Sequence, residues 1–308
     1  MTTTVLPPTS IERPLRQTPS SSRVCTIIMI PTNRPRKPAC AELVVHAMLQ
    51  AYPLGSSIPR PGKRRIEWPD FPDEHARFLE SNPNAMLLGL LFDRMMDAGK
   101  AWQGPLGLAR RLGHLDPLRL SNMSEADLEA AIRGRPGEQA LQRFPSQTAR
   151  SIKACAHKLV RSYRGDASNI WAHDPGARVV RDRLLEFRGI SQKLANVMTC
   201  LLTSTYGVPL SGWCDIDVAV DRHVCRVFLR TGLVDGAPGR PRHPANALVD
   251  SVVQAARRLH PAFPGGLDTP AFDIGQTWCR AGGAACLDGC PLLEVCPRNR
   301  THWEIGAG

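Results

Sequence analysis

The chain has 308 residues, of which 43% are hydrophobic and 22% are charged, as in an ordinary globular protein. This length is enough for one large domain or two modest ones. No apolar run approaches the roughly 20 residues that a membrane helix needs, so we expect no membrane span. The apolar residues 24–30 are closed by Pro31 and make a poor signal peptide, which favours a cytoplasmic protein.

The formal net charge of +11 is concentrated near the N-terminus. Residues 1–65 contain ten Lys and Arg residues against Glu12 and Glu42, which leaves a net charge of only +3 for the remainder. Such a basic segment is either a solvated tail or an arm that binds nucleic-acid phosphates without sequence preference. Because it is also rich in Pro, Ser and Thr, we expect 1–65 to be flexible, apart from a candidate short helix over 42–50.

From Trp68 onward the apolar residues recur at helical spacing and strand signals are almost absent, which predicts an all-α fold. The helix expected over 84–100 begins with Asn-Pro-Asn, and the helix expected over 124–133 begins with a capping box from Ser124 to Asp127. Helices are expected over 84–100, 105–112, 124–133, 146–163 and 178–187.

A tight turn, Arg188-Gly189-Ile190-Ser191, separates the last of these helices from a new helix that starts near Gln192. Gly189 supplies the backbone freedom that a sharp helix-to-helix turn needs. The first backbone N–H groups of the new helix are left open, and together with the positive helix end they make a seat for a phosphate. Binding through phosphates suits a protein that must scan any nucleic-acid sequence.

Lys193 lies in the first turn of this new helix, on a different stripe from its apolar residues. A helix N-terminus disfavours a cation, and partial burial has the same effect, so both favour the neutral amine. A neutral amine can attack C1′ of a sugar or form a Schiff base. The alternative interpretation is a surface lysine beside a helix start.

Asp221 stands 28 residues further on, at the start of a helix whose buried face is marked by Val224, Val227 and Phe228. An N-cap carboxylate accepts backbone N–H bonds and stays ionised. An ionised carboxylate can stabilise positive charge on a sugar or help to deprotonate an attacking amine. The plain alternative is a helix cap with no chemical role.

These two segments together carry a resemblance to a known family. GISQK at 189–193 and VDRHVCR at 220–226 resemble the helix-hairpin-helix glycosylases, endonuclease III in particular, whose pattern is roughly LPGVGxKTA followed by VDTHxxR. The resemblance implies that Lys193 is the catalytic lysine and Asp221 the catalytic aspartate. It extends from about residue 84 to the C-terminus, with Arg188 where the family usually has Pro and Ser191 where it usually has Gly.

Four cysteines crowd into 18 residues near the C-terminus, with the spacing C-x6-C-x3-C-x5-C. Four thiolates at short range suit a [4Fe–4S] cluster or a structural Zn²⁺, and spacing alone does not separate these. The endonuclease III family holds a cluster on C-x6-C-x2-C-x5-C at the same place, so the resemblance implies the cluster. The predicted ligands are Cys279, Cys286, Cys290 and Cys296.

The resemblance also implies two helical domains with the active site in the cleft between them. A six-helix barrel is expected over 84–210 and a cluster domain over 66–83 and 211–308. Lys193 then comes from the first domain and Asp221 from the second.

The function implied is that of a base-excision repair glycosylase. It is expected to flip and remove a damaged base, by default an oxidised pyrimidine, and to nick the abasic site as a lyase. Its expected partner is double-stranded DNA, and the protein is expected to be a nucleoid-associated monomer. Residues expected to contact DNA are Arg188, Gly189, Ile190, Ser191 and, as a wedge or phosphate contact, Arg94.

Asp93 and Asp97 are expected near the base pocket or as helix caps. Three alternatives remain open for the whole chain. The first is a monofunctional glycosylase that uses water and only Asp221. The second is a non-catalytic DNA-binding protein that keeps the hairpin and the cluster, and the third is a zinc-ribbon module with an unrelated helical domain.

Overall fold

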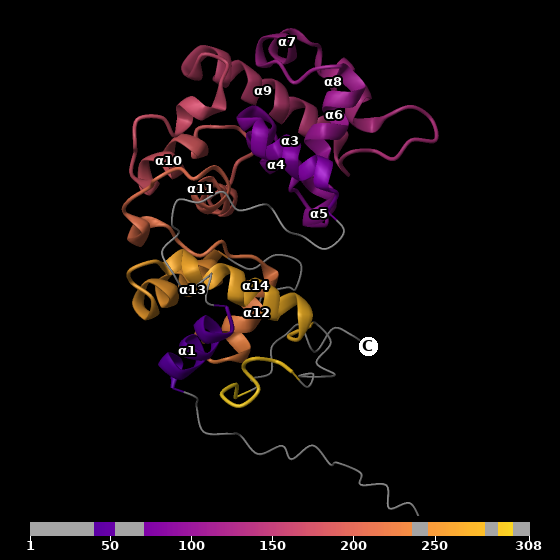
Figure 1. The fold of residues 1–308 in the computed structure, drawn as a ribbon. Coiled ribbons are helices and arrows are strands. Elements are labelled where there is room, and N and C mark those ends of the chain that lie inside the picture. The colour runs from indigo at the N-terminus through magenta and orange to yellow at the C-terminus, as the bar shows by residue number, and fades with distance from the viewer. Residues whose placement is uncertain (1–39, 53–70, 236–245, 281–288, 298–308) are drawn as a thin grey trace, which may run out of the picture. The chain divides into compact units, whose positions relative to one another are not determined.

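The computed structural model describes residues 40–52, 71–235, 246–280 and 289–297, all within one compact unit that spans 36–308. Across these ranges the regular structure consists of α-helices and short 3-10 helices, without a strand (Figure 1). The all-α prediction is therefore confirmed for the described residues. None of the described helices combines the length and the apolar character needed to cross a membrane.

A first hydrophobic core is built from helices in the stretch 73–206, with Trp213 and Phe263 added from later in the chain. Its helices are α3 (Asp73–Ser81), α4 (Pro83–Phe92), α5 (Ala98–Ala101), α6 (Gly104–Leu112), α7 (Pro117–Asn122), α8 (Glu125–Arg133), α9 (Pro145–Tyr163), α10 (Ala177–Leu185) and α11 (Gln192–Tyr206). The 3-10 helices are η1 (Ala167–Ile170), η2 (Trp213–Asp215) and η3 (Pro264–Leu267).

Helix α4 is the most deeply buried element of this core. All residues from Ala85 to Phe92 are buried, so the helix is apolar on every side, as expected for an element surrounded by others. Asn82 caps its start by accepting a hydrogen bond from the Ala85 N–H at 3.0 Å. The helix expected over 84–100 is broken, because α4 ends at Phe92 and Asp97 caps a separate short helix, α5.

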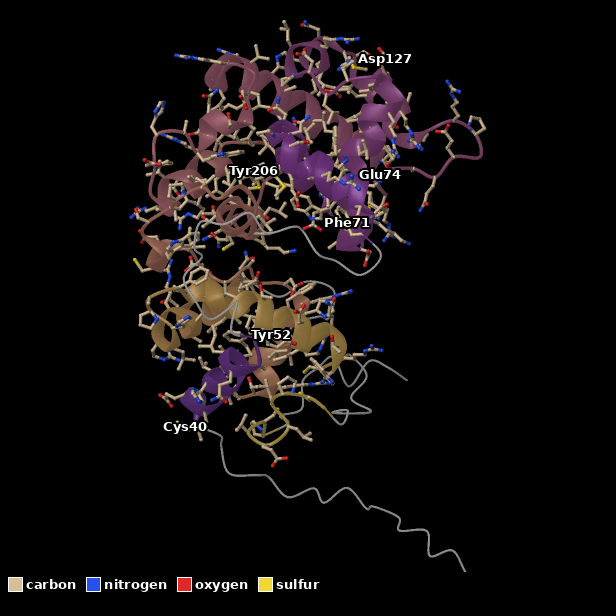
Figure 2. The ribbon with its side chains drawn as sticks, in the orientation of Figure 1. Cys40, Tyr52, Phe71, Glu74, Asp127 and Tyr206 are labelled. Atoms are coloured by element: carbon tan, nitrogen blue, oxygen red, sulfur yellow. The ribbon has the colours of Figure 1, made fainter. Side chains whose placement is uncertain are left out.

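The two ends of the stretch 73–206 are tied together through α3. The Tyr206 hydroxyl, at the end of α11, donates a hydrogen bond to the Leu79 carbonyl of α3. Glu74, which Figure 2 labels on α3, forms a 2.6 Å ion pair with Arg110 of α6. Leu79 is 1% exposed and belongs to the first core. The division into domains 84–210 and 66–83 plus 211–308 stays a prediction.

A second hydrophobic core is built from elements of both chain ends. It contains α1 (Ala41–Ala51), α12 (Arg222–Arg230), α13 (Asn246–Leu259) and α14 (Asp268–Thr277), which lie side by side in Figure 1. Helix α1 corresponds to the short helix expected over 42–50, and its Val44, Val45 and Met48 pack into this core. Residues 1–39 and 53–65 lie outside the described ranges.

Helices α12 and α14 approach each other closely at Gly275. A Cβ atom at this position would lie 2.7 Å from the His223 Cβ and 2.8 Å from its backbone oxygen. Because the two helices are so close, Arg226, which is 2% exposed, donates a 2.5 Å hydrogen bond to the Gly275 carbonyl. The absence of a side chain at Gly275 therefore sets the spacing of the two helices.

Replacing Gly275 by Ala should lower the free energy of unfolding by about 1–3 kcal/mol, because the added methyl group overlaps the backbone of α12. Denaturant unfolding measures this change. Gly176→Ala is the control, since a Cβ there would meet nothing nearer than 3.8 Å at a φ of −63°. An equal loss in both variants would contradict the close approach.

Candidate active site

The hairpin turn, residues 188–191, joins α10 to α11 as the sequence predicts. Gly189 has a φ of +95°, which only glycine adopts readily. Ser191 caps α11 by accepting a hydrogen bond from the Leu194 N–H at 3.4 Å. The hydroxyl gives Ser191 a local role at the position where glycine is usual in the family it resembles.

The four hairpin residues predicted to bind DNA divide into two groups. Arg188, Gly189 and Ser191 are exposed, whereas Ile190 is 7% exposed and packs the turn onto the first core. Among the described residues, none accepts a hydrogen bond from the backbone N–H of Gln192. Open donors at a helix start are the feature that suits a phosphate. The contacts themselves stay a prediction.

Lys193 lies in the first turn of α11, next to a carboxylate from α4. Its Nζ is 3.8 Å from Oδ2 of Asp93, the residue that directly follows α4. The side chains are 37% and 16% exposed, so the amine is accessible while the carboxylate is largely covered. Lys193 therefore has a carboxylate neighbour that its position at the start of a helix did not predict.

Asp221 caps the start of α12 as predicted. Its Oδ1 accepts hydrogen bonds from the backbone N–H groups of His223 at 2.8 Å and Val224 at 2.9 Å. The helix thus holds one carboxylate oxygen, and no described residue donates a hydrogen bond to the other, Oδ2. The capping role and a chemical role are therefore compatible.

Asp268, at the start of α14, is an acidic neighbour that sequence reasoning missed. Burial, together with the negative charge of Asp221, raises its pKa to about 7, whereas the positive charge of Lys193 opposes the shift. This carboxyl therefore changes protonation near neutral pH. Nothing in the sequence around Asp268 indicates a buried position near Asp221, because only the packing of α14 against α12 creates that position.

Electrostatic coupling relates these four side chains to one another. Burial raises the pKa of Asp93, Lys193 lowers it, and Asp221 and Asp97 raise it. Lys193 and Asp221 therefore both act on Asp93 as well as on Asp268. The result is one accessible amine among three carboxyl groups, an arrangement suited to nucleophilic attack with proton transfer.

The loop 93–97 next to Lys193 presents exposed side chains. Arg94 is exposed, and Met95 is 58% exposed with a φ of +54°. The fully buried Gln142 holds the loop by donating a 2.7 Å hydrogen bond from Nε2 to the Arg94 carbonyl. The side chain of Arg94 is therefore on an anchored loop, and its role as a wedge or phosphate contact stays a prediction.

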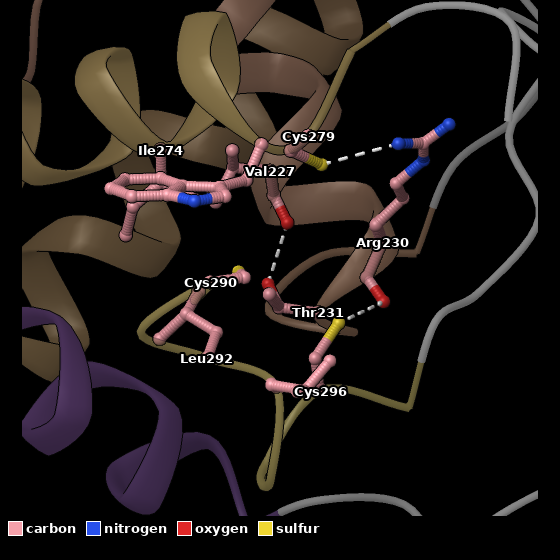
Figure 3. A pocket seen from close by; sticks show the side chains of 10 residues that line it. Val227, Arg230, Thr231, Ile274, Cys279, Cys290, Leu292 and Cys296 are labelled. Atoms are coloured by element: carbon pink, nitrogen blue, oxygen red, sulfur yellow. Dashed lines mark hydrogen bonds between the residues drawn. The ribbon is translucent and has the colours of Figure 1, made fainter. Parts of the chain in front are cut away.

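Three of the four predicted metal ligands line one pocket beside α12. Cys279, Cys290 and Cys296 share it with apolar side chains such as Val227 and Ile274 (Figure 3). Cys286 lies outside the described residues. Arg230, which is 5% exposed, donates a 3.3 Å hydrogen bond to the Cys279 sulfur.

The chemical type of the side chains that line this pocket suits a thiolate-bound metal group. Several sulfurs beside a buried guanidinium suit negatively charged thiolates, which a cluster or a zinc ion needs. Among the described residues, no three His, Cys, Asp or Glu side chains are grouped closely enough to hold a metal ion. The three cysteine side chains that line the pocket are therefore not gathered closely enough to form a metal site by themselves.

Replacing Gly189 by Ala should destabilise the protein, because the hairpin turn then carries both backbone strain and steric overlap. The positive φ costs about 1–2 kcal/mol for a residue with a Cβ. That Cβ would also meet the Ser151 hydroxyl at 3.0 Å. Gly137→Ala is the matched control, with a φ of +89° and nothing within 4 Å. Thermal unfolding measures the loss, and an equal loss in the two variants would contradict the close packing of the Gly189 turn.

Comparison with known proteins finds no matching family model and no matching curated protein. Among solved structures, two complexes of endonuclease III with DNA, one a trapped covalent intermediate, are similar with a TM-score of 0.53 and 19% identity. Each similarity covers 83% of this chain and 95% of the other. A thermostable thymine-DNA glycosylase is similar with a TM-score of 0.52 and 14% identity, over 83% of this chain and 94% of the other. The chain therefore has the fold of the endonuclease III-like helix-hairpin-helix glycosylases.

Proposed function

We propose that this protein is a DNA glycosylase of base-excision repair that also cleaves the abasic site as a lyase. The observation that carries the proposal is the partly exposed Lys193 amine in the first turn after the hairpin. Asp93 lies 3.8 Å from this amine, and the charge of Asp221 acts on Asp93. The fold supports it, because one similar structure is endonuclease III trapped covalently on DNA.

In this proposal the protein grips double-stranded DNA through its phosphates. The exposed hairpin residues and the open N–H groups at the start of α11 bind the backbone without reading sequence. Arg94 lies on the anchored loop next to Lys193 and would contact the duplex there. The damaged nucleotide is turned out of the stack, which brings its C1′ atom to the amine.

The chemistry begins with nucleophilic attack by the neutral Lys193 amine on C1′. The bond between C1′ and the base breaks, and the bonding electrons leave with the base. Oδ2 of Asp221 stabilises the positive charge that develops on the sugar in this step. The two protons of the amine pass to the departing base and to the ring oxygen O4′ as the C1′–O4′ bond opens, which leaves a Schiff base between the nitrogen and C1′. Loss of a proton from C2′ then expels the 3′ phosphate by β-elimination, which breaks the C3′–O bond.

The first substrate class to test is oxidised pyrimidines, which the family resemblance implies. A monofunctional glycosylase would release the same base but would leave the strand intact, with water as the nucleophile. A non-catalytic DNA-binding protein would release no base. Strand nicking without added heat or base therefore separates the proposed activity from both alternatives.

Sodium borohydride should trap the wild-type protein covalently on a duplex that contains one abasic site, because it reduces the Schiff base to a stable amine. Lys193→Ala should lose the trapped species, which denaturing gel electrophoresis detects. Lys153→Ala is the matched control, since this lysine donates to the Met123 carbonyl instead of facing Asp93. Equal trapping by Lys193→Ala would refute the assignment of the nucleophile.

We further propose that Cys279, Cys286, Cys290 and Cys296 hold a [4Fe–4S] cluster, with a structural zinc ion as the alternative. The support is the shared pocket of three of these cysteines and the Arg230 hydrogen bond to Cys279. When bound, the cluster would supply structural support and position α12 on DNA. Arg226 donates to the Cys279 carbonyl and so connects this segment with the helix that Asp221 caps.

Protein purified without oxygen should contain about four iron atoms per chain and show broad visible absorbance. Cys290→Ser should lose most of both signals, because one ligand is removed. Cys214→Ser is the control, since Cys214 is exposed and lies outside the cysteine pocket. Zinc without iron in the wild type would contradict the cluster.

A further inference from the structure

Asp93 is placed to exchange a proton with the Lys193 amine. Its Oδ2 atom lies 3.8 Å from Nζ, within the reach of a small side-chain movement. The carboxyl is only 16% exposed, so little water competes for its protons. Because α4 is buried on every side and ends at Phe92, the backbone that carries Asp93 is fixed relative to the core.

The other charged groups that face Asp93 come from three elements. Lys193 is on α11, Asp221 caps α12, and Asp97 caps α5. Burial together with the two carboxylates raises the pKa of Asp93, and Lys193 only partly offsets this. A carboxyl of this kind is a better proton acceptor than an exposed aspartate.

The neighbouring acids are less suited to this exchange. Oδ1 of Asp221 already accepts two backbone hydrogen bonds, and its remaining oxygen serves the sugar in the proposed function. Asp97 accepts the Lys100 N–H at 3.2 Å as the cap of α5. Asp93 has no comparable capping bond among the described residues, and its carboxylate pairs with the Lys193 amine instead.

We propose that Asp93 is the proton acceptor that frees the Lys193 amine for attack and then returns that proton. This inference rests on the proposed lyase function and deepens it. First, one proton moves from the ammonium to the Asp93 carboxylate, which leaves a neutral amine and a carboxylic acid. The lone pair of the amine then forms a bond to C1′ of the ring-opened abasic sugar.

The remaining proton transfers restore the Asp93 carboxylate. A second proton passes from the attacking nitrogen to the former carbonyl oxygen, which gives a carbinolamine. The Asp93 carboxylic acid protonates this hydroxyl, which leaves as water when the C1′–O bond breaks. The products are the protonated Schiff base, one water molecule and the restored Asp93 carboxylate, without any further reactant.

The test is the rate of Schiff-base formation on preformed abasic duplex, measured by borohydride trapping under single-turnover conditions across a pH series. Asp93→Asn should slow this step by about 100-fold, as expected when one proton-transfer group is lost. Asp93→Glu should recover much of the rate. Asp116→Asn is the matched control, because Asp116 caps α7 through Arg119 and asparagine can still cap there.

The pH dependence gives a second readout. In the wild type the rate should rise as pH increases through the pKa of Asp93, because the carboxylate is the accepting form. This limb should be absent from Asp93→Asn. Duplex binding measured by anisotropy should be unchanged, which distinguishes lost chemistry from lost folding or lost affinity.

The outcomes separate the two proposals. If the wild type traps and Asp93→Asn traps at an equal or higher rate, Asp93 merely pairs with the amine and this inference is wrong. If the wild type forms no trapped species on abasic DNA, the lyase function itself is overturned. A slow Asp93→Asn variant with the wild-type pH limb would also contradict the inference, since the limb would then belong to another group.

Discussion

The contact between Lys193 and Asp93 is the interaction on which the site depends. It joins the end of α4, the most buried helix of the first core, to the first turn of α11. Gly189 sets where α11 begins, because only its left-handed backbone completes the hairpin turn. The core therefore fixes an otherwise flexible lysine beside an acid, and a partly covered ion pair of this kind controls protonation more than stability.

The second constraint is the spacing of α12 and α14. Gly275 lets the two helices approach, and this places Asp268 at the start of one helix within electrostatic reach of Asp221 at the start of the other. Arg226 connects the same pair of helices to the Cys279 segment. A metal group in the cysteine pocket would thus support the helix that Asp221 caps. Its role would then be structural, and it would take no part in the chemical step.

The local parts of this site could be predicted from the sequence. The glycine turn, the start of α11 near Lys193 and the cap at Asp221 each depend on a few neighbouring residues, so spacing and residue type were enough. The acidic partners of Lys193 could not be predicted from the sequence in the same way. Asp93 appeared only as an acid near the pocket, and Asp268 did not appear at all, because both positions depend on packing between distant helices. The sequence predicted the helix α1 but not the core against which it packs, because an amphipathic segment does not indicate which other helices cover its apolar face.

The claim that an amine and a carboxyl meet at this site can be tested without any substrate. Carbodiimide coupling joins lysine amines to carboxylates that touch them, and mass spectrometry of the digested protein identifies the linked pairs. We predict a bond between Lys193 and Asp93, together with the internal control between Lys158 and Glu186, which form a 2.5 Å ion pair. Formation of the control bond with no bond at Lys193 would contradict the arrangement of the site.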